Sequence, residues 1–257
     1  MYSRFIDTHT HLYLPEFAGD IEVVIQRAVN EGVTKFYLPS IDRETGINLL
    51  ELEAKFPGKC FAMMGLHPCS VKDNYEDQLH WVEQWLGKRQ FAAVGEIGLD
   101  LYWDKTFIKE QSIAFKRQIQ WALQYNRPVV IHSRNALDEC IEIVKEQQNG
   151  NLRGIFHCFS GTYEQALEIT NAGLYLGIGG VITYKNAGLA EVISKISPEH
   201  MVLETDAPYL APVPFRGKRN ESSYLKYVVE KLALITNRSP EEVGKITTRN
   251  AENIFSN

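Results

Sequence analysis

The chain has 257 residues, a length that fits one large domain or two smaller ones, and single α/β barrels are also about this long. Its 27 Lys and Arg residues against 32 Asp and Glu residues give a net charge of −5, which argues against a generally basic protein that coats nucleic acid. Any nucleic-acid contact must therefore be local. No apolar run approaches the roughly 18 residues of a membrane helix, and no secretory apolar segment follows the first residues.

The four cysteines indicate a reducing environment. They are Cys60, Cys69, Cys140 and Cys158, widely and irregularly spaced with no Cys-x-x-Cys pair. We therefore expect reduced thiols and a cytoplasmic protein. We also expect a monomer that does not bind membranes.

Short apolar runs rich in β-branched residues alternate with segments of helical periodicity along the whole chain. The runs predict strands over residues 5–9, 35–38, 60–66, 92–97, 129–132, 154–159, 174–179 and 201–206. The intervening segments predict helices over 21–29, 47–56, 79–86, 107–125, 137–144, 163–172, 187–196 and 224–235. Ser239-Pro240-Glu241-Glu242 is a capping box with proline at the first helical position, which predicts one more helix.

Eight strand–helix units in about 250 residues match a (β/α)8 TIM barrel with an extra C-terminal helix, and we expect residues 1–257 to form this single domain. A doubly wound open sheet is the rival fold. Its dinucleotide-binding version has little support, because no Gly-x-Gly-x-x-Gly follows the first strand.

Polar residues stand at the ends of these apolar strands, where barrel enzymes carry their catalytic groups. Asp7, His9 and His11 alternate at the end of the first strand, so they project to the same side. Four further polar residues hold similar positions on later strands: Glu96, His132, His157 and Asp206. Unrelated salt bridges and core histidines are the alternative interpretation, but so many coincidences disfavour it.

Imidazole and carboxylate ligands suit a borderline divalent ion such as zinc or manganese, and two carboxylates can bridge to a second ion. Two ions can hold a hydroxide nucleophile and a substrate oxygen, the arrangement used for displacement at phosphorus. Asp206 can bind one ion and accept the proton of its water, which makes it the candidate general base.

Six ordered blocks carry a family resemblance: Asp7-Thr8-His9-Thr10-His11, Gly65-Leu66-His67-Pro68, Gly95-Glu96-Ile97-Gly98-Leu99-Asp100, Val130-Ile131-His132-Ser133-Arg134, His157-Cys158-Phe159-Ser160-Gly161 and Glu204-Thr205-Asp206-Ala207-Pro208-Tyr209. Together they closely resemble the TatD family of metal-dependent deoxyribonucleases, over nearly the whole chain. The resemblance implies an amidohydrolase-type TIM barrel, two divalent ions (Mg²⁺, Mn²⁺ or Zn²⁺), and hydrolysis of DNA phosphodiester bonds, in several relatives as a 3′-to-5′ exonuclease.

Carried over by position, the resemblance implies a set of metal ligands, of which Asp206 and Glu96 would also be catalytic: His9, His11, Glu96, His132, His157 and Asp206. Asp7 and Glu204 are expected to support these ligands from behind. Candidate substrate contacts are the remaining polar groups near the strand ends: His67, Arg134, Arg216, Lys218, Arg219 and Asn220. The family commonly has proline where Ser222 stands, so this basic loop is expected to be less rigid.

Three residues outside this set also carry expectations. Cys158 alternates with His157, so its thiol should face the helices as a small apolar group, not act as a nucleophile. Tyr102 and Trp103, in the loop after Asp100, are candidates for stacking on bases.

Two other functions stay open. The same metal centre can hydrolyse a carbon–nitrogen or carboxyl-ester bond, because a fold does not fix the substrate. Many amidohydrolases bridge their metals with a carboxylated lysine after the fourth strand, whereas Glu96 stands in that region here, which favours the nuclease branch. A non-catalytic binding protein is the third hypothesis, but none of the six ligands is missing.

Overall fold

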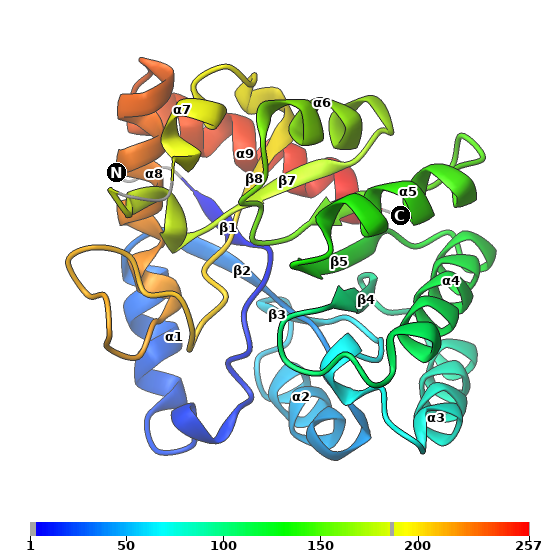
Figure 1. The fold of residues 1–257 in the computed structure, drawn as a ribbon. Helices are drawn as coiled ribbons and strands as arrows, with labels where there is room; N and C mark the ends of the chain where they lie inside the picture. The colour runs from blue at the N-terminus through cyan, green and yellow to red at the C-terminus, as the bar shows by residue number, and fades with distance from the viewer. Residues whose placement is uncertain (1–3, 186–187, 257) are drawn as a thin grey trace.

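The computed structural model describes residues 4–185 and 188–256. Within these ranges, eight parallel strands form the centre of the molecule and helices surround them (Figure 1). The strands are β1 (Phe5–Asp7), β2 (Val33–Leu38), β3 (Cys60–Ala62), β4 (Val94–Asp100), β5 (Val129–Arg134), β6 (Gly154–Phe156), β7 (Tyr175–Ile178) and β8 (Met201–Leu203). All eight predicted strands are therefore present in the predicted order.

Hydrogen bonds close the strands into a barrel. The ladders connect β1 to β3 and β4 to β8 in sequence order. One seam is bridged between Met64 and Val94, where the backbone N–H of Gly95 also donates to Met64 O at 3.0 Å. At the other seam the N–H of Thr8 donates to Leu203 O at 3.0 Å. The predicted α/β barrel is thus confirmed.

The helices follow the strands as predicted, with ends that differ by a few residues: α1 (Ile21–Asn30), α2 (Arg43–Lys55), α3 (Tyr75–Lys88), α4 (Ile108–Gln124), α5 (Leu137–Gln147), α6 (Tyr163–Asn171), α7 (Leu189–Ile193), α8 (Leu225–Thr236) and α9 (Pro240–Phe255). Helix α7 is shorter than the predicted 187–196: it begins after Gly188, whose φ of 65° favours glycine, and residue 187 lies outside the described residues. No helix in the described part of the chain has the length and apolarity of a membrane span.

The extra C-terminal helix closes the amino-terminal end of the barrel. Ile6, Val130 and Val202 point into the barrel and form one buried cluster with Ala251 and Ile254 of α9. The helix is also tied to the base of β8, because the Asn250 carboxamide donates to Pro198 O at 2.9 Å and to Met201 O at 2.8 Å. With one end filled by apolar side chains, only the carboxyl end is left for a polar site.

Five strands are shorter than the sequence predicts, and three of them end just before a candidate site residue. β1 ends at Asp7, β6 at Phe156 and β8 at Leu203, so the predicted strand ends at residues 9, 159 and 206 were wrong. Beyond β6 and β8 the backbone turns sharply, since Cys158 and Asp206 have φ values of 48° and 55°. The apolar pattern of the sequence does not predict these turns. They place polar side chains over the mouth of the barrel.

Candidate metal centre

Seven polar side chains converge at the carboxyl end of the barrel. They form three groups, in each of which the potential ligand atoms lie within 4.8 Å of one another: His9, His11 and Asp206; His9, Glu96 and His157; and His67, Glu96 and His132. The structure therefore brings together all six sequence-predicted ligands, and it adds His67 to them.

Glu96 lies at the centre of this cluster. Its Oε1 atom is 2.8 Å from Nε2 of His157, 2.8 Å from Nδ1 of His132 and 3.4 Å from Nε2 of His67. Its Oε2 atom is 3.2 Å from Nε2 of His9. Burial raises the pKa of Glu96, but the surrounding imidazoles outweigh burial and hold this pKa well below its usual range. Glu96 is thus an ionised carboxylate that faces two sides of the centre.

Asp206 occupies the solvent side of the same centre. Its Oδ1 atom lies 3.6 Å from Nε2 of His9 and 3.5 Å from Nε2 of His11, and 14% of its side chain is exposed. The backbone N–H of Asp206 donates to His9 O at 2.9 Å, which fixes the loop after β8 against the loop after β1. Asp206 therefore contacts the cluster and remains open to an incoming molecule.

The hydrogen bonds of His11 show that this donor set fits a cation. The Tyr13 hydroxyl donates its one proton to Pro39 O at 2.6 Å, so it accepts from Nδ1 of His11 at 3.0 Å. In the neutral imidazole, Nε2 of His11 then carries a lone pair. That lone pair faces Nε2 of His9 at 3.3 Å and the Asp206 carboxylate at 3.5 Å. Convergent lone pairs and carboxylates form a site that favours a divalent ion.

Behind the ligands lie carboxylates that orient them, and Asp100 is one that the sequence reasoning missed. Its Oδ2 atom lies 2.9 Å from Nε2 of His132. Its backbone N–H donates to Gln111 Oε1 at 2.9 Å, which holds the residue in place. Asp100 is the last residue of β4, a polar residue after an apolar run, so the criterion that selected the other strand-end residues would have found it.

Glu204 takes the supporting position expected of it. Its Oε1 atom accepts from the backbone N–H of Cys158 at 2.5 Å and lies 3.6 Å from Nδ1 of His157. Space for this carboxylate depends on Gly177, because an added Cβ there would lie 2.3 Å from Oε2 of Glu204. Glu204 thus holds the loop that carries His157.

Asp7 supports the loop after β8. It accepts from the backbone N–H of Thr205 at 3.0 Å and from the Thr205 hydroxyl at 2.7 Å. Burial raises the pKa of Asp7 to about 7. The hydrogen bonds of Asp7 therefore fix Thr205, the residue between Glu204 and Asp206.

His67 contacts the cluster as a hydrogen-bond donor. Its Nδ1 atom accepts from the backbone N–H of Cys69 at 3.0 Å, so in the neutral ring the proton is on Nε2, which faces Glu96. Burial lowers the pKa of His67, but the charge of Glu96 outweighs burial and raises the pKa overall. A protonated Nε2 suits contact with a substrate oxygen better than metal ligation.

The predicted basic residues fall into two groups. Arg134, Arg216 and Lys218 are exposed, and no ion pair with a carboxylate is formed by them within residues 4–185 and 188–256. Arg219 is already paired, with guanidinium nitrogens 2.9 and 2.7 Å from the two carboxylate oxygens of Asp20. The first three therefore stay available for phosphate, whereas Arg219 is held by the protein.

The structure corrects the expectation for Asn220. This residue is fully buried, and its carboxamide donates to Thr205 O and Tyr209 O, both at 2.7 Å. It cannot contact substrate without breaking these bonds, so it fixes the loop after β8. The neighbouring Ser222 is also buried, and Glu221 is bound by Arg27 at 2.6 Å, so the end of the basic loop is anchored where we expected less rigidity.

The prediction for Cys158 depended on strand alternation, and alternation does not set the direction of this side chain because the chain leaves the strand after Phe156. Burial, followed by the charges of Asp206 and Glu204, raises the pKa of its thiol well above the usual range. The thiol therefore lies under the influence of the site, and it stays protonated at neutral pH.

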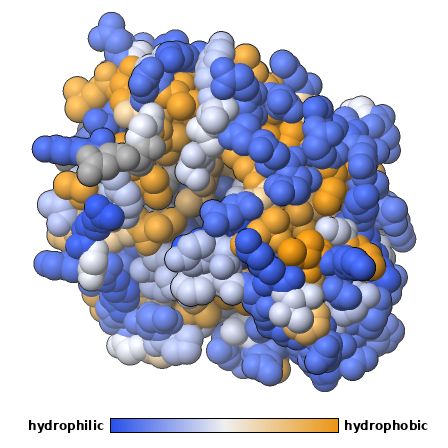
Figure 2. Space-filling view, viewed as in Figure 1, coloured by the Kyte–Doolittle hydropathy of each residue, from blue (hydrophilic) through white to orange (hydrophobic). Residues whose placement is uncertain are grey.

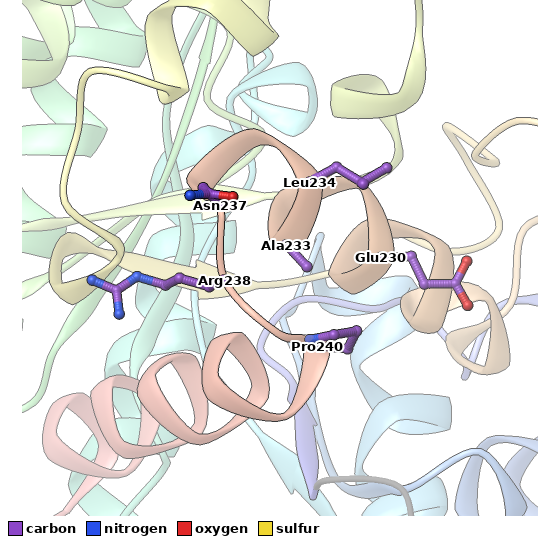
Figure 3. A pocket seen from close by; sticks show the side chains of 6 residues that line it. All are labelled: Glu230, Ala233, Leu234, Asn237, Arg238 and Pro240. Atoms are coloured by element: carbon purple, nitrogen blue, oxygen red, sulfur yellow. The ribbon is translucent and has the colours of Figure 1, made fainter.

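A separate surface pocket lies at the turn between α8 and α9 (Figure 3). Its lining includes Ala233, Leu234 and Pro240, together with Glu230 and Arg238. It contains no residue of the cluster at the barrel mouth, and its one carboxylate and one guanidinium offer no set of metal ligands. We therefore place the functional site at the barrel mouth.

A barrel with a buried cluster of imidazoles and carboxylates at its carboxyl end is typical of a metal-dependent hydrolase. Comparison with known proteins gives the family: the TatD related DNase family matches residues 6–256, and the chain belongs to it. The resemblance noted in the sequence is thus confirmed.

Individual relatives support this assignment. The chain is 39% identical to the uncharacterized metal-dependent hydrolase YabD of Bacillus subtilis over 97% of this chain and 98% of that protein. It is 33% identical to YjjV of Escherichia coli, an uncharacterized metal-dependent hydrolase, over 100% and 99% of the two chains. The crystal structure of YjjV, described as a TatD homolog, superimposes with a TM-score of 0.94 at 32% identity over both whole chains. The crystal structure of a TatD family hydrolase from Entamoeba histolytica superimposes with a TM-score of 0.85 at 25% identity, and the match covers 100% of this chain and 99% of that one.

Proposed function

We propose that this protein is a deoxyribonuclease that hydrolyses DNA phosphodiester bonds from the 3′ end with two divalent ions (Mg²⁺, Mn²⁺ or Zn²⁺). The observation that carries the proposal is the position of Asp206. Its carboxylate contacts the imidazoles of His9 and His11 and is also partly exposed, and the loop that follows it in the chain carries the exposed cations Arg216 and Lys218. The family name supports DNA as the substrate.

The two carboxylates and four imidazoles would hold the ions, Glu96 from the centre and Asp206 from the solvent side. A bound divalent ion supplies Lewis acidity, which lowers the pKa of water and polarises the phosphoryl group. Asp206 accepts the proton of the attacking water, because it is the ligand carboxylate that solvent reaches. Attack on phosphorus breaks a P–O ester bond, and the leaving oxygen takes up a proton.

The remaining groups bind and position the substrate. His67 donates from Nε2 to a phosphate oxygen, at the side of the centre where this nitrogen faces Glu96. Arg216 and Lys218 bind neighbouring phosphates, since such contacts fix the register of the DNA chain without reading its sequence. Arg216 is held in place by Tyr184, with its guanidinium 4.6 Å from the ring centroid.

The test uses single-stranded DNA labelled at one end, incubated with the purified full chain and Mg²⁺, Mn²⁺ or Zn²⁺. We expect mononucleotides to be released in order from the 3′ end, with loss of activity in EDTA and in Asp206→Asn. Hydrolysis of carboxyl-ester or amide substrates by a protein that leaves DNA intact with every ion would overturn the proposal. Binding of DNA without turnover would also overturn it.

A further inference from the structure

Two aromatic side chains next to the metal centre are exposed. Tyr102 and Trp103, in the loop after β4, have 51% and 67% of their surfaces exposed. Their rings meet edge to face, with centroids 4.8 Å apart at 86°. Figure 2 shows hydrophobic residues gathered between hydrophilic ones on the face of the molecule that Figure 1 presents. Two adjacent exposed aromatic rings beside a candidate site leave aromatic surface available for contact with a ligand.

The guanidinium of Arg134 packs against this aromatic pair. The Arg134 guanidinium lies 4.0 Å from the Tyr102 ring centroid and 5.1 Å from that of Trp103. Arg134 follows His132 by two residues on β5, and its backbone O accepts from the N–H of Leu101 at 3.0 Å. The three side chains thus form one unit, which we call the aromatic platform: Tyr102, Trp103 and Arg134.

The aromatic platform is tied directly to the metal centre. One carboxylate oxygen of Asp100, Oδ1, accepts from the backbone N–H groups of Tyr102 at 3.0 Å and Trp103 at 3.1 Å. The other, Oδ2, contacts His132 at 2.9 Å. A single side chain therefore sets the position of the aromatic rings relative to a candidate metal ligand.

We infer that the aromatic platform is a nucleobase-binding site, on which the base of a nucleotide stacks while its phosphate lies at the metal centre. This inference rests on the proposed function and adds a binding site to it. An aromatic face accepts any base, and the Arg134 charge beside it matches a phosphate. A paired base inside a duplex is stacked on both faces already and cannot use the platform without unpairing.

Binding measurements test the inference without turnover. In an Asp206→Asn background with Mn²⁺, fluorescence anisotropy gives the Kd for a labelled thymidine octamer and for an octamer of the same length that lacks all bases. Removal of one stacking contact should raise the Kd of the thymidine octamer about 5- to 100-fold in Trp103→Ala. Trp103→Phe, which keeps an aromatic face, should change it less than about threefold. The base-free octamer should bind both variants equally.

Two controls separate stacking from other effects. Leu234, 79% exposed on α8, provides the matched control Leu234→Ala, which should leave both Kd values unchanged. Arg134→Ala should weaken both octamers, because both carry phosphates. Equal losses for the two octamers in Trp103→Ala, no loss for either, or no binding of the thymidine octamer by the Trp103-containing protein would overturn the inference. If wild type binds through Trp103 but cleaves no DNA, the proposed function fails while the platform stands.

Discussion

The carboxylate of Asp100 lies 2.9 Å from Nε2 of His132, on the side of the imidazole opposite Glu96, whose Oε1 atom is 2.8 Å from Nδ1. A carboxylate only accepts hydrogen bonds, so the bond to Asp100 occupies Nε2 as a donor and leaves Nδ1 as the nitrogen that faces the centre. The contact therefore fixes both the ring orientation and the nitrogen that serves as a ligand. Metal-binding histidines commonly depend on such a partner.

Asp100→Asn should reduce metal affinity about 10- to 100-fold, the usual effect of removing a carboxylate behind a metal-binding histidine. The expected result is a weaker Zn²⁺ or Mn²⁺ Kd by calorimetric titration, with little change in fold by circular dichroism. Asp73→Asn is the matched control, because Asp73 is exposed. An Asp100→Asn protein with wild-type metal affinity would contradict this role.

Asp206→Asn should lower kcat at least about a hundredfold, since a general base contributes about 10²- to 10⁴-fold. Bound metal should fall less, because the histidines remain. Glu204→Gln should cost less activity, since Glu204 is fully buried and contacts His157 from behind. Measurement of kcat and metal content for both variants on labelled DNA separates the roles. An active, metal-loaded Asp206→Asn protein would refute the base assignment.

Much of the fold was predictable because the positions of apolar residues in the sequence indicate the strands and helices. Each barrel strand alternates between the interior, as at Ile6 and Val202, and the layer beneath the helices, as at Phe5. The strand ends were less predictable, because the turns at Cys158 and Asp206 adopt positive φ without glycine. Such turns are maintained by tertiary contacts, here the bond from the Asp206 N–H to His9 O.

The candidate ligands were predictable from their positions after apolar strands, whereas their supporting residues were not. In the sequence Tyr13 belongs to an apolar stretch and gives no sign of a polar role. Only the structure shows that its hydroxyl lies between His11 and Pro39. Likewise, Arg219 and Asn220 belong to a basic loop motif, but their partners are distant in sequence or are backbone carbonyls. A motif gives the residue types at a site, and the contacts decide which of them remain free.

The combined change Arg216→Ala and Lys218→Ala should raise KM for DNA more than it lowers metal affinity, because these exposed side chains bind phosphates. The salt dependence of DNA binding should also decrease, since fewer counterions are released. Arg219→Ala is the matched control: its partner is Asp20, and it should affect the loop more than KM. Unchanged KM with reduced metal affinity would exclude the phosphate role.

Chelation should lower the thermal stability of the metal-loaded protein. An ion that binds only the folded state at about 100 times its Kd stabilises it by about 2.7 kcal/mol. For a chain of this length, that shifts Tm by roughly 5–10 °C. We expect EDTA to lower Tm and added Mn²⁺ to restore it in wild type, with a smaller shift in the double variant His9→Ala and His11→Ala. Equal shifts in both proteins would place the stabilising ion elsewhere.

The four unpaired cysteines should react with a thiol reagent in an order set by burial and by nearby carboxylates. Burial disfavours the thiolate and raises the pKa of Cys60 to about 12, so at pH 8 only about 10⁻⁴ of this thiol is ionised. Burial also raises the pKa of Cys140. Cys158 is partly exposed like Cys69, but desolvation and the charges of Asp206 and Glu204 raise its pKa and disfavour its thiolate. We therefore expect one fast thiol per native chain at pH 8.

All four thiols should react in guanidinium, because unfolding removes the burial. In the native protein, the slow reactions should accelerate about tenfold for each pH unit between 8 and 10, since the thiolate fraction rises tenfold per unit below the pKa. Cys69→Ser should abolish the fast phase and leave the slow ones. Two or more fast thiols in the native chain, or a fast phase that survives Cys69→Ser, would show that the raised pKa values do not control reactivity.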